Sequence, residues 1–82
     1  MKYITYLHNQ SQEKLMFMFD AAEAHAEVAK RLNVFPISAG HLTFSSDEGT
    51  IVVEVECHGE SSTLDLTPTE QDTEIAKRML GL

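Results

Sequence analysis

The sequence predicts a small α+β domain with the element order β-α-β-β-β-α. In this prediction, a long helix packs on one face of a mostly antiparallel four-stranded sheet, and a short helix ends the chain. Three segments carry the prediction: the helix-forming stretch Gln12 to Leu32, the alternating residues of His41 to Cys57, and the capped segment Pro68 to Leu80. At 82 residues, the chain 1–82 is expected to be one domain, because neither half could bury a core alone.

The first predicted strand is Lys2 to Leu7, which mixes β-branched and aromatic residues. Apolar residues fall on both of its faces, and this favours a position inside the sheet over an exposed edge. The next three residues are expected to form a loop, in which Asn9 or Ser11 caps the following helix.

The long helix is predicted over Gln12 to Leu32. At about 100° per residue, its apolar residues cover roughly half of the circumference, more than a helix needs to pack on one sheet. We expect Lys30 and Arg31 in its last turn and Asn33 as a left-handed terminator. The excess apolar surface is expected either to lie under the second helix or to contact another molecule. The residues expected at this interface are Phe17, Ala21, Ala24 and Val28.

A β-hairpin is predicted over His41 to Cys57, where alternating residues flank the turn-forming segment Ser46 to Gly49. A four-residue loop would fix the register of the two strands. The expected opposed pairs are Phe44 with Ile51, Leu42 with Val53, and His41 with Glu54.

A short strand over Ser62 to Leu66 and a helix over Pro68 to Leu80 complete the predicted fold. The helix should begin with Thr67 as N-cap and Glu70 at the third position, which together make a capping box, and should end at Gly81. Its apolar stripe is narrow, so we expect it to pack at the periphery. The sheet face expected against the long helix consists of Leu42, Phe44, Ile51, Val53, Val55, Leu64 and Leu66.

The chain is acidic, with 13 Asp and Glu against 6 Lys and Arg and a formal charge of −7. This balance argues against direct binding to nucleic acid, which requires a basic surface, and against binding to an anionic membrane. The single cysteine cannot form an internal disulfide, and no long apolar run resembles a signal peptide or a membrane span. The expected location is cytoplasmic, and no motif predicts a cofactor.

Two residues with reactive side chains have structural interpretations. His25 lies within the apolar arc of the predicted helix, where we expect a buried neutral imidazole bonded to a backbone carbonyl or a tyrosine hydroxyl. The alternative is a pH-sensitive group at a subunit contact. Cys57 is expected to be a small buried apolar residue, because its neighbour His58 points to the other face of the strand.

Two polar clusters are candidate binding surfaces. The first is a secondary candidate for a metal site, although its two histidines are expected well apart along the strands. It consists of His41, Glu54, Glu56 and His58. The second is an acidic surface that could imitate a phosphate backbone or simply be solvated. It consists of Asp20, Glu23, Glu27, Glu70, Asp72 and Glu74.

These features predict a non-catalytic, acidic protein–protein interaction or regulatory module that self-associates as a homodimer, either through the exposed part of the helix's apolar arc or through a sheet edge. One alternative is a nucleic-acid mimic that inhibits a DNA- or RNA-binding enzyme, and a second is a small metal- or ligand-binding domain. An enzyme is the least favoured interpretation, because the chain has no glycine-rich phosphate loop, Cys-x-x-Cys pair or nucleophile elbow.

Overall fold

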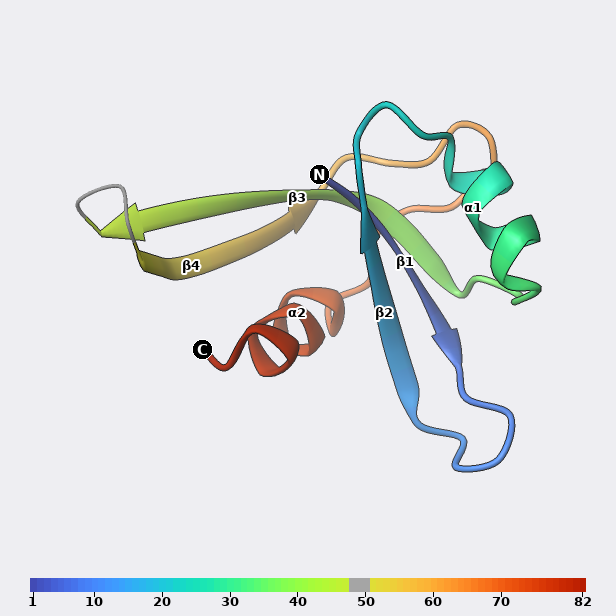
Figure 1. The fold of residues 1–82 in the computed structure, drawn as a ribbon, viewed down its shortest axis with the longest axis horizontal. Coiled ribbons are helices and arrows are strands. Elements are labelled where there is room, and N and C mark those ends of the chain that lie inside the picture. Colours follow the sequence, from blue (N-terminus) through green and yellow to red (C-terminus); the bar gives the residue numbers. More distant parts are fainter. Residues whose placement is uncertain (48–50) are drawn as a thin grey trace.

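The computed structural model describes the backbone of residues 1–47 and 51–82 and the side chains of residues 1–46 and 54–82. It consists of two successive units, each a β-hairpin followed by a helix (Figure 1). The elements are β1 (Lys2–Leu7), β2 (Lys14–Phe19), α1 (His25–Leu32), β3 (Ser38–Asp47), β4 (Ile51–His58) and α2 (Asp72–Leu80). The predicted α+β class and four-stranded antiparallel sheet are confirmed, whereas the predicted element order and helix lengths are wrong.

The sheet has the strand order β2-β1-β3-β4, with every neighbouring pair antiparallel. The predicted first strand is confirmed, and it lies inside the sheet, with Tyr3, Ile4 and Thr5 all fully buried. β3 joins the two hairpins, because its beginning pairs with β1 and the remainder pairs with β4. The hairpins diverge along β3, and α2 lies in the angle between them (Figure 1).

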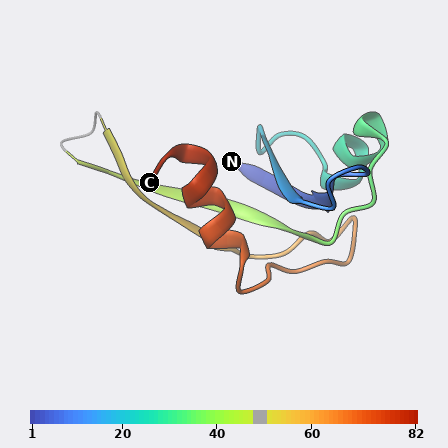
Figure 2. The ribbon, with the colours of Figure 1, turned by 90° about the horizontal axis from the view of Figure 1, so that it is seen from below.

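The two helices pack on opposite faces of the sheet, because the alternation of β1 sends Tyr3 and Ile4 to different sides. Around Tyr3, the core contains Met16, Leu42, Val55, Ile75 and Ala76, the last two from α2. Around Ile4, it contains Phe19, Val28, Ala29 and Ala39, with Val28 and Ala29 from α1. Figure 2 shows the two helices apart, with the segment between β4 and α2 running toward α1 and back.

The prediction of a long helix over residues 12–32 is wrong. Its first part is the strand β2, which pairs with β1 along its whole length, and only its last eight residues form α1. The segment where a helix cap was expected is the hairpin loop, in which Gln12 has a φ of 58°. The predicted end of the helix is confirmed, because Asn33 is left-handed with a φ of 56°.

The sequence of β2, KLMFMF, explains this error. Both sets of alternate residues are mostly apolar, so the strand has no polar stripe and fills a wide arc on a helical wheel. Leucine and methionine also favour helices, but intrinsic propensity is a weak influence that tertiary packing overrides. As a strand, the segment buries Met16 and Phe19, at 3% and 6% exposure, and supplies β1 with its second backbone partner.

The predicted hairpin exists, but its register is wrong. The observed pairs are His41 with His58, Leu42 with Cys57, and Phe44 with Val55. β3 continues to Asp47, past the expected start of the turn, and each of these partners is four positions later than predicted. An even shift keeps each residue on its predicted face. Glu48 and Gly49 of the predicted turn lie outside the described residues, as do the side chains of Ile51 and Val53.

The predicted strand over Ser62 to Leu66 is also wrong. Ser61 and Leu66 form a single bridge that closes a tight loop, and the Ser61 hydroxyl accepts the backbone N–H of Leu64 at 3.2 Å. Leu64 and Leu66 then pack in the α1 layer, on the opposite side of the sheet from Leu42. The single apolar face expected from the sequence is therefore divided between two layers.

Gly40 allows three segments to approach closely. A Cβ atom there would lie 2.7 Å from the carbonyl oxygen of His58, 2.9 Å from Cγ of Pro68 and 3.2 Å from Cε1 of Tyr3. Backbone and ring atoms cannot give way easily in a packed core.

We predict that Gly40→Ala lowers the free energy of unfolding by about 1–3 kcal/mol, the usual cost of overpacking. Chemical denaturation of the purified protein measures this change. The control Ser62→Ala alters an exposed residue and should shift stability by less than about 0.5 kcal/mol. Equal stability of Gly40→Ala and the wild type would contradict the close packing.

Candidate functional site

Asp72 is a fully buried carboxylate at the beginning of α2. Its Oδ2 accepts the Tyr3 hydroxyl at 2.6 Å and the Thr69 backbone N–H at 3.0 Å. Its Oδ1 accepts the Ser38 hydroxyl at 3.0 Å and the Thr69 hydroxyl at 2.5 Å, and Ser38 also bonds to Thr5. This cluster has residue types found in hydrolytic enzymes, but Tyr3, Ser38 and Asp72 are each 0% exposed, so it connects elements and does not face solvent.

The cluster corrects two predictions. α2 begins at Asp72 and not at Pro68. The Asp72 carboxylate accepts the backbone N–H of Thr69, which is one of the two hydrogen bonds of a capping box. The box was expected between Thr67 and Glu70. Asp72, expected on an acidic surface, lies in the core. The Thr-x-x-Asp spacing starting at Thr69 was the available signal, but the proline at position 68 favoured the earlier start.

The hydrogen bonds of the cluster determine the charge of Asp72. Burial acts to raise the pKa of this carboxyl, but the bonds from Thr69, Tyr3 and Ser38 outweigh it and hold the pKa below the ordinary value of 3.8. Burial and the neighbouring carboxylate raise the pKa of the Tyr3 hydroxyl. Tyr3 therefore stays neutral and donates to an ionised Asp72.

A row of three histidines lies on the α1 side of the sheet. The ring of His25 meets His41 edge-on, with centroids 5.6 Å apart, and His41 stacks on His58 at 6.0 Å. His25 is buried, and its Nε2–H donates to the carbonyl oxygen of Gly40 at 2.8 Å, which confirms the predicted buried imidazole bonded to a backbone carbonyl. Burial lowers the pKa of His25, against the opposing effect of the Gly40 bond, so the ring is neutral near pH 7.

The four candidate metal ligands do share one face of the β3–β4 hairpin. His41 and His58 are directly opposite, contrary to the expectation that they lie far apart, whereas Glu56 and Glu54 face Thr43 and Ser45 farther along the strands. His58 Nε2 bonds to the Thr43 hydroxyl at 2.5 Å. Among the described residues, no group of three His, Cys, Asp or Glu side chains is placed to hold a metal ion.

Cys57 has the environment expected of an apolar residue. It is half-buried and packs against the core around Tyr3, and burial raises the pKa of its thiol. Its backbone N–H donates to the Thr73 hydroxyl at 3.2 Å.

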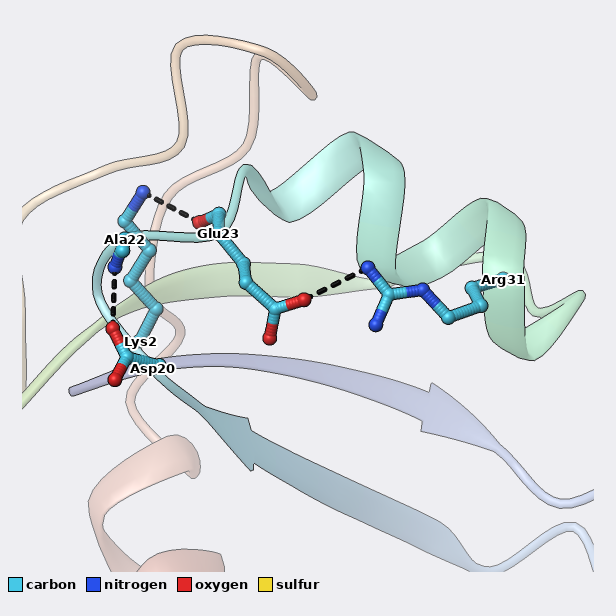
Figure 3. A network of polar contacts seen from close by, with 5 residues as sticks. All are labelled: Lys2, Asp20, Ala22, Glu23 and Arg31. Atoms are coloured by element: carbon cyan, nitrogen blue, oxygen red, sulfur yellow. Dashed lines mark hydrogen bonds and ion pairs between the residues drawn. The ribbon is translucent and has the colours of Figure 1, made fainter.

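The predicted acidic residues do not form one surface. Asp20 and Glu23 lie in the loop between β2 and α1, where Asp20 accepts the N–H of Ala22 at 2.7 Å (Figure 3). In the same loop, Glu23 pairs with Arg31 at 2.8 Å, and its carbonyl accepts the Lys2 ammonium at 2.8 Å. Glu27 lies on α1, whereas Glu70 lies just before α2 and Glu74 in its first turn, on the other side of the sheet.

The four residues predicted at an interface are also separated. Val28 is buried under α1 at 1% exposure, Ala24 is half-buried before the helix, and Ala21 lies in the exposed loop. Phe17 lies on β2 and is 38% exposed, a large value for an aromatic residue on a strand. Phe17 therefore remains as a candidate contact, in a different setting from the one predicted.

The outer edge of β2 has free backbone groups. β2 is an edge strand of the sheet, and within the described residues it pairs with β1 alone. The His8 N–H donates to the Glu13 carbonyl at 2.8 Å, which continues the β1–β2 register. Because bonded and non-bonded pairs alternate in an antiparallel ladder, the residues whose N–H and C=O groups point outward are Lys14, Met16 and Met18.

Apolar side chains accompany this open backbone. The rings of Phe17 and Phe19 lie parallel, with centroids 6.2 Å apart, and Leu15 is half-buried on the same face. Phe19 packs into the core with Val28, whereas Phe17 is not part of that core and is 38% exposed. An apolar edge strand of this kind is a common site of strand addition.

The other edge of the sheet, β4, is partly covered. The outward N–H of Cys57 is bonded to Thr73 of α2, as described above, and the exposed side chains of Glu54 and Glu56 line the strand. Charges on an edge strand discourage pairing with another chain. The two edges of the sheet therefore have opposite properties.

No protein-family model, no curated protein and no solved structure matches this chain. No helix in the described part of the chain is long and apolar enough to cross a membrane.

We predict that Asp72→Asn lowers the free energy of unfolding by about 2–3 kcal/mol, because an amide places donors against the donors that now bond to the carboxylate. Because folding lowers the pKa of Asp72, the ionised carboxylate stabilises the wild type fully above pH 3.8. This contribution to the free energy of unfolding is lost below that pH, as the pH falls through the folded-state pKa. Denaturant titration of both proteins at pH 7 and pH 3 measures the effect. The control Glu70→Gln, at the predicted cap, should change stability by less than about 0.5 kcal/mol.

We predict that protonation of His25 destabilises the protein in mild acid. Its pKa is lowered by folding, so the unfolded chain binds the proton more tightly, and stability should decrease as pH falls through about 6.5. His25→Gln retains a donor for Gly40 and should show a smaller fall in melting temperature between pH 7.5 and 5.5. His58→Gln, at the exposed end of the row, is the control. A wild-type pH profile in His25→Gln would contradict the assignment.

Proposed function

We propose that this chain is a non-catalytic protein–protein interaction module that self-associates, and that the outer edge of β2 is its binding surface. The exposure of Phe17 on an edge strand carries the proposal, because it combines apolar area with unpaired backbone groups in one place. Strand addition uses both, since backbone hydrogen bonds give affinity and alternate side chains give specificity.

The other described features support a binding role over a catalytic one. The Asp72 carboxylate is fully buried, and the two outer histidines of the row bond to the Gly40 carbonyl and the Thr43 hydroxyl. These contacts engage the Asp72 carboxylate and one ring nitrogen each of His25 and His58, so these groups bond within the protein and are not free for a substrate.

The mimicry of nucleic acid by an acidic surface is less well supported. The formal charge of −7 favours a basic partner. However, α1 and α2 carry their carboxylates on opposite sides of the sheet, and two carboxylates already have cationic partners, Glu23 with Arg31 and Glu74 with Lys77. The β2 edge needs no such convergence of charge, and it is therefore the surface that we propose.

The proposal is tested by the concentration dependence of sedimentation. The wild type should dimerise reversibly at micromolar concentration, and Phe17→Ser should raise the dissociation constant at least about tenfold, because burial of a phenylalanine contributes about 1.5–3 kcal/mol. Phe17 is exposed in the monomer, so this variant should retain its fold by circular dichroism.

Phe35→Ser is the matched control, because Phe35 is 93% exposed and lies in the loop between α1 and β3, a strand that β1 separates from β2. It removes more exposed apolar area than Phe17→Ser but should leave the dimer unchanged. A wild type that stays monomeric near 1 mM, a concentration corresponding to very weak binding, would contradict self-association. Loss of the dimer in Phe35→Ser alone would contradict the assignment to β2.

A further inference from the structure

We infer that the partner at the β2 edge is a second copy of this chain, paired antiparallel so that Phe17 lies opposite Phe17 of the second copy. The two four-stranded sheets would then form one continuous sheet across a two-fold axis. This inference rests on the proposed function, and it adds the two-fold antiparallel arrangement of the two copies and the register of their contact.

The backbone of β2 is compatible with this pairing. Two identical antiparallel strands related by a two-fold axis place one residue opposite itself, and that residue defines the register. With Phe17 at the axis, the outward N–H and C=O groups of Met16 face those of Met18 in the second copy. Phe17 itself forms a non-bonded pair, in which side chains approach most closely.

The charges near the ends of β2 select this register. Lys14 is the first residue of the strand, and Asp20 is exposed immediately after its last residue. With Phe17 at the axis, Lys14 of each copy lies opposite Asp20 of the other, on the same face. Lys14 now donates to the neutral side chain of Gln71 at 3.1 Å, so its charge has no acidic partner in this contact. Each dimer would gain two opposite-charge pairs.

Apolar residues fill the space between these charged pairs. Leu15 lies opposite Phe19 of the second copy, Met16 lies opposite Met18, and the two Phe17 rings meet at the axis. A two-fold axis perpendicular to the sheet keeps each residue on its own face. The exposed ring of Phe17 is thereby covered by its own copy, and the apolar face of each β2 continues into the other.

Neighbouring registers lose this complementarity. With Met16 at the axis, Lys14 faces Met18 and Glu13 faces Phe19 of the second copy. With Met18 at the axis, Asp20 faces Met16 and Lys14 faces Ala22. Both registers place charges against apolar side chains and form none of the opposite-charge pairs.

Disulfide crosslinking tests the register directly. Phe17→Cys and Leu15→Cys are prepared with Cys57→Ala, which removes the natural thiol. They are oxidised with copper phenanthroline at a protein concentration well above the dissociation constant measured for Phe17→Ser, so that loss of the phenylalanine does not prevent dimerisation. At the axis, the two Cα atoms at position 17 lie about 4.5 Å apart, within the range of a disulfide. The Cα atoms at position 15 are offset by four residues, about 14 Å, too far for a bond. We expect rapid dimer formation for Phe17→Cys and little for Leu15→Cys.

Charge exchange provides an independent test. Lys14→Glu places two carboxylates opposite each other at both ends of the contact and should weaken the dimer about tenfold, because like charges across strands destabilise a sheet. Lys14→Glu combined with Asp20→Lys restores both pairs and should recover most of the wild-type affinity. Circular dichroism of each variant confirms that the monomer is folded.

The outcomes distinguish this inference from the proposed function. Crosslinking at position 15 that is as fast as, or faster than, crosslinking at position 17 would overturn the register. So would a doubly exchanged variant that dimerises more weakly than Lys14→Glu alone. A dimer that requires Phe17 but does not crosslink at position 17 would do the same, while leaving association through the β2 edge supported. A wild-type dimer insensitive to Phe17→Ser would overturn both.

Discussion

The buried carboxylate of Asp72 is the interaction on which the arrangement of the elements depends. It joins β1 through Tyr3, β3 through Ser38 and the segment before α2 through Thr69, so one side chain connects three parts of the sequence. A buried charge is tolerated only when such donors surround it. Its position holds α2 in the angle between the hairpins, and α1 and the 59–71 segment cover the other face.

The sequence predicted an element correctly where the intrinsic propensity of its residues and their burial favour the same secondary structure. The sequence predicted the strand β1 from its β-branched and aromatic residues, and it predicted the end of α1 at Asn33. It also predicted that Leu42 and Phe44 lie on the same face of β3. β2 was not, because its leucine and methionine residues are compatible with a helix, and only pairing with β1 decides for a strand. That pairing is a property of the whole fold, and local propensity cannot supply it.

The candidate site was predicted in part. Phe17 was identified as an exposed apolar residue, but its neighbours Ala21, Ala24 and Val28 were chosen from a helical wheel that does not apply to a strand. The outward backbone of Met16 and Met18 could not be foreseen, since it requires the strand order of the sheet. The burial of Asp72 was missed because its donors Tyr3 and Ser38 are distant in the sequence.

The unequal edges of the sheet determine how far assembly can proceed. In the proposed dimer, pairing through β2 would use the same strand of both copies, so β4 would be left at each end of the enlarged sheet. There Thr73 already occupies the N–H of Cys57, and Glu54 and Glu56 repel an approaching strand. The proposed contact would therefore close after two copies, whereas a sheet with two open apolar edges could add chains without limit and grow into a filament.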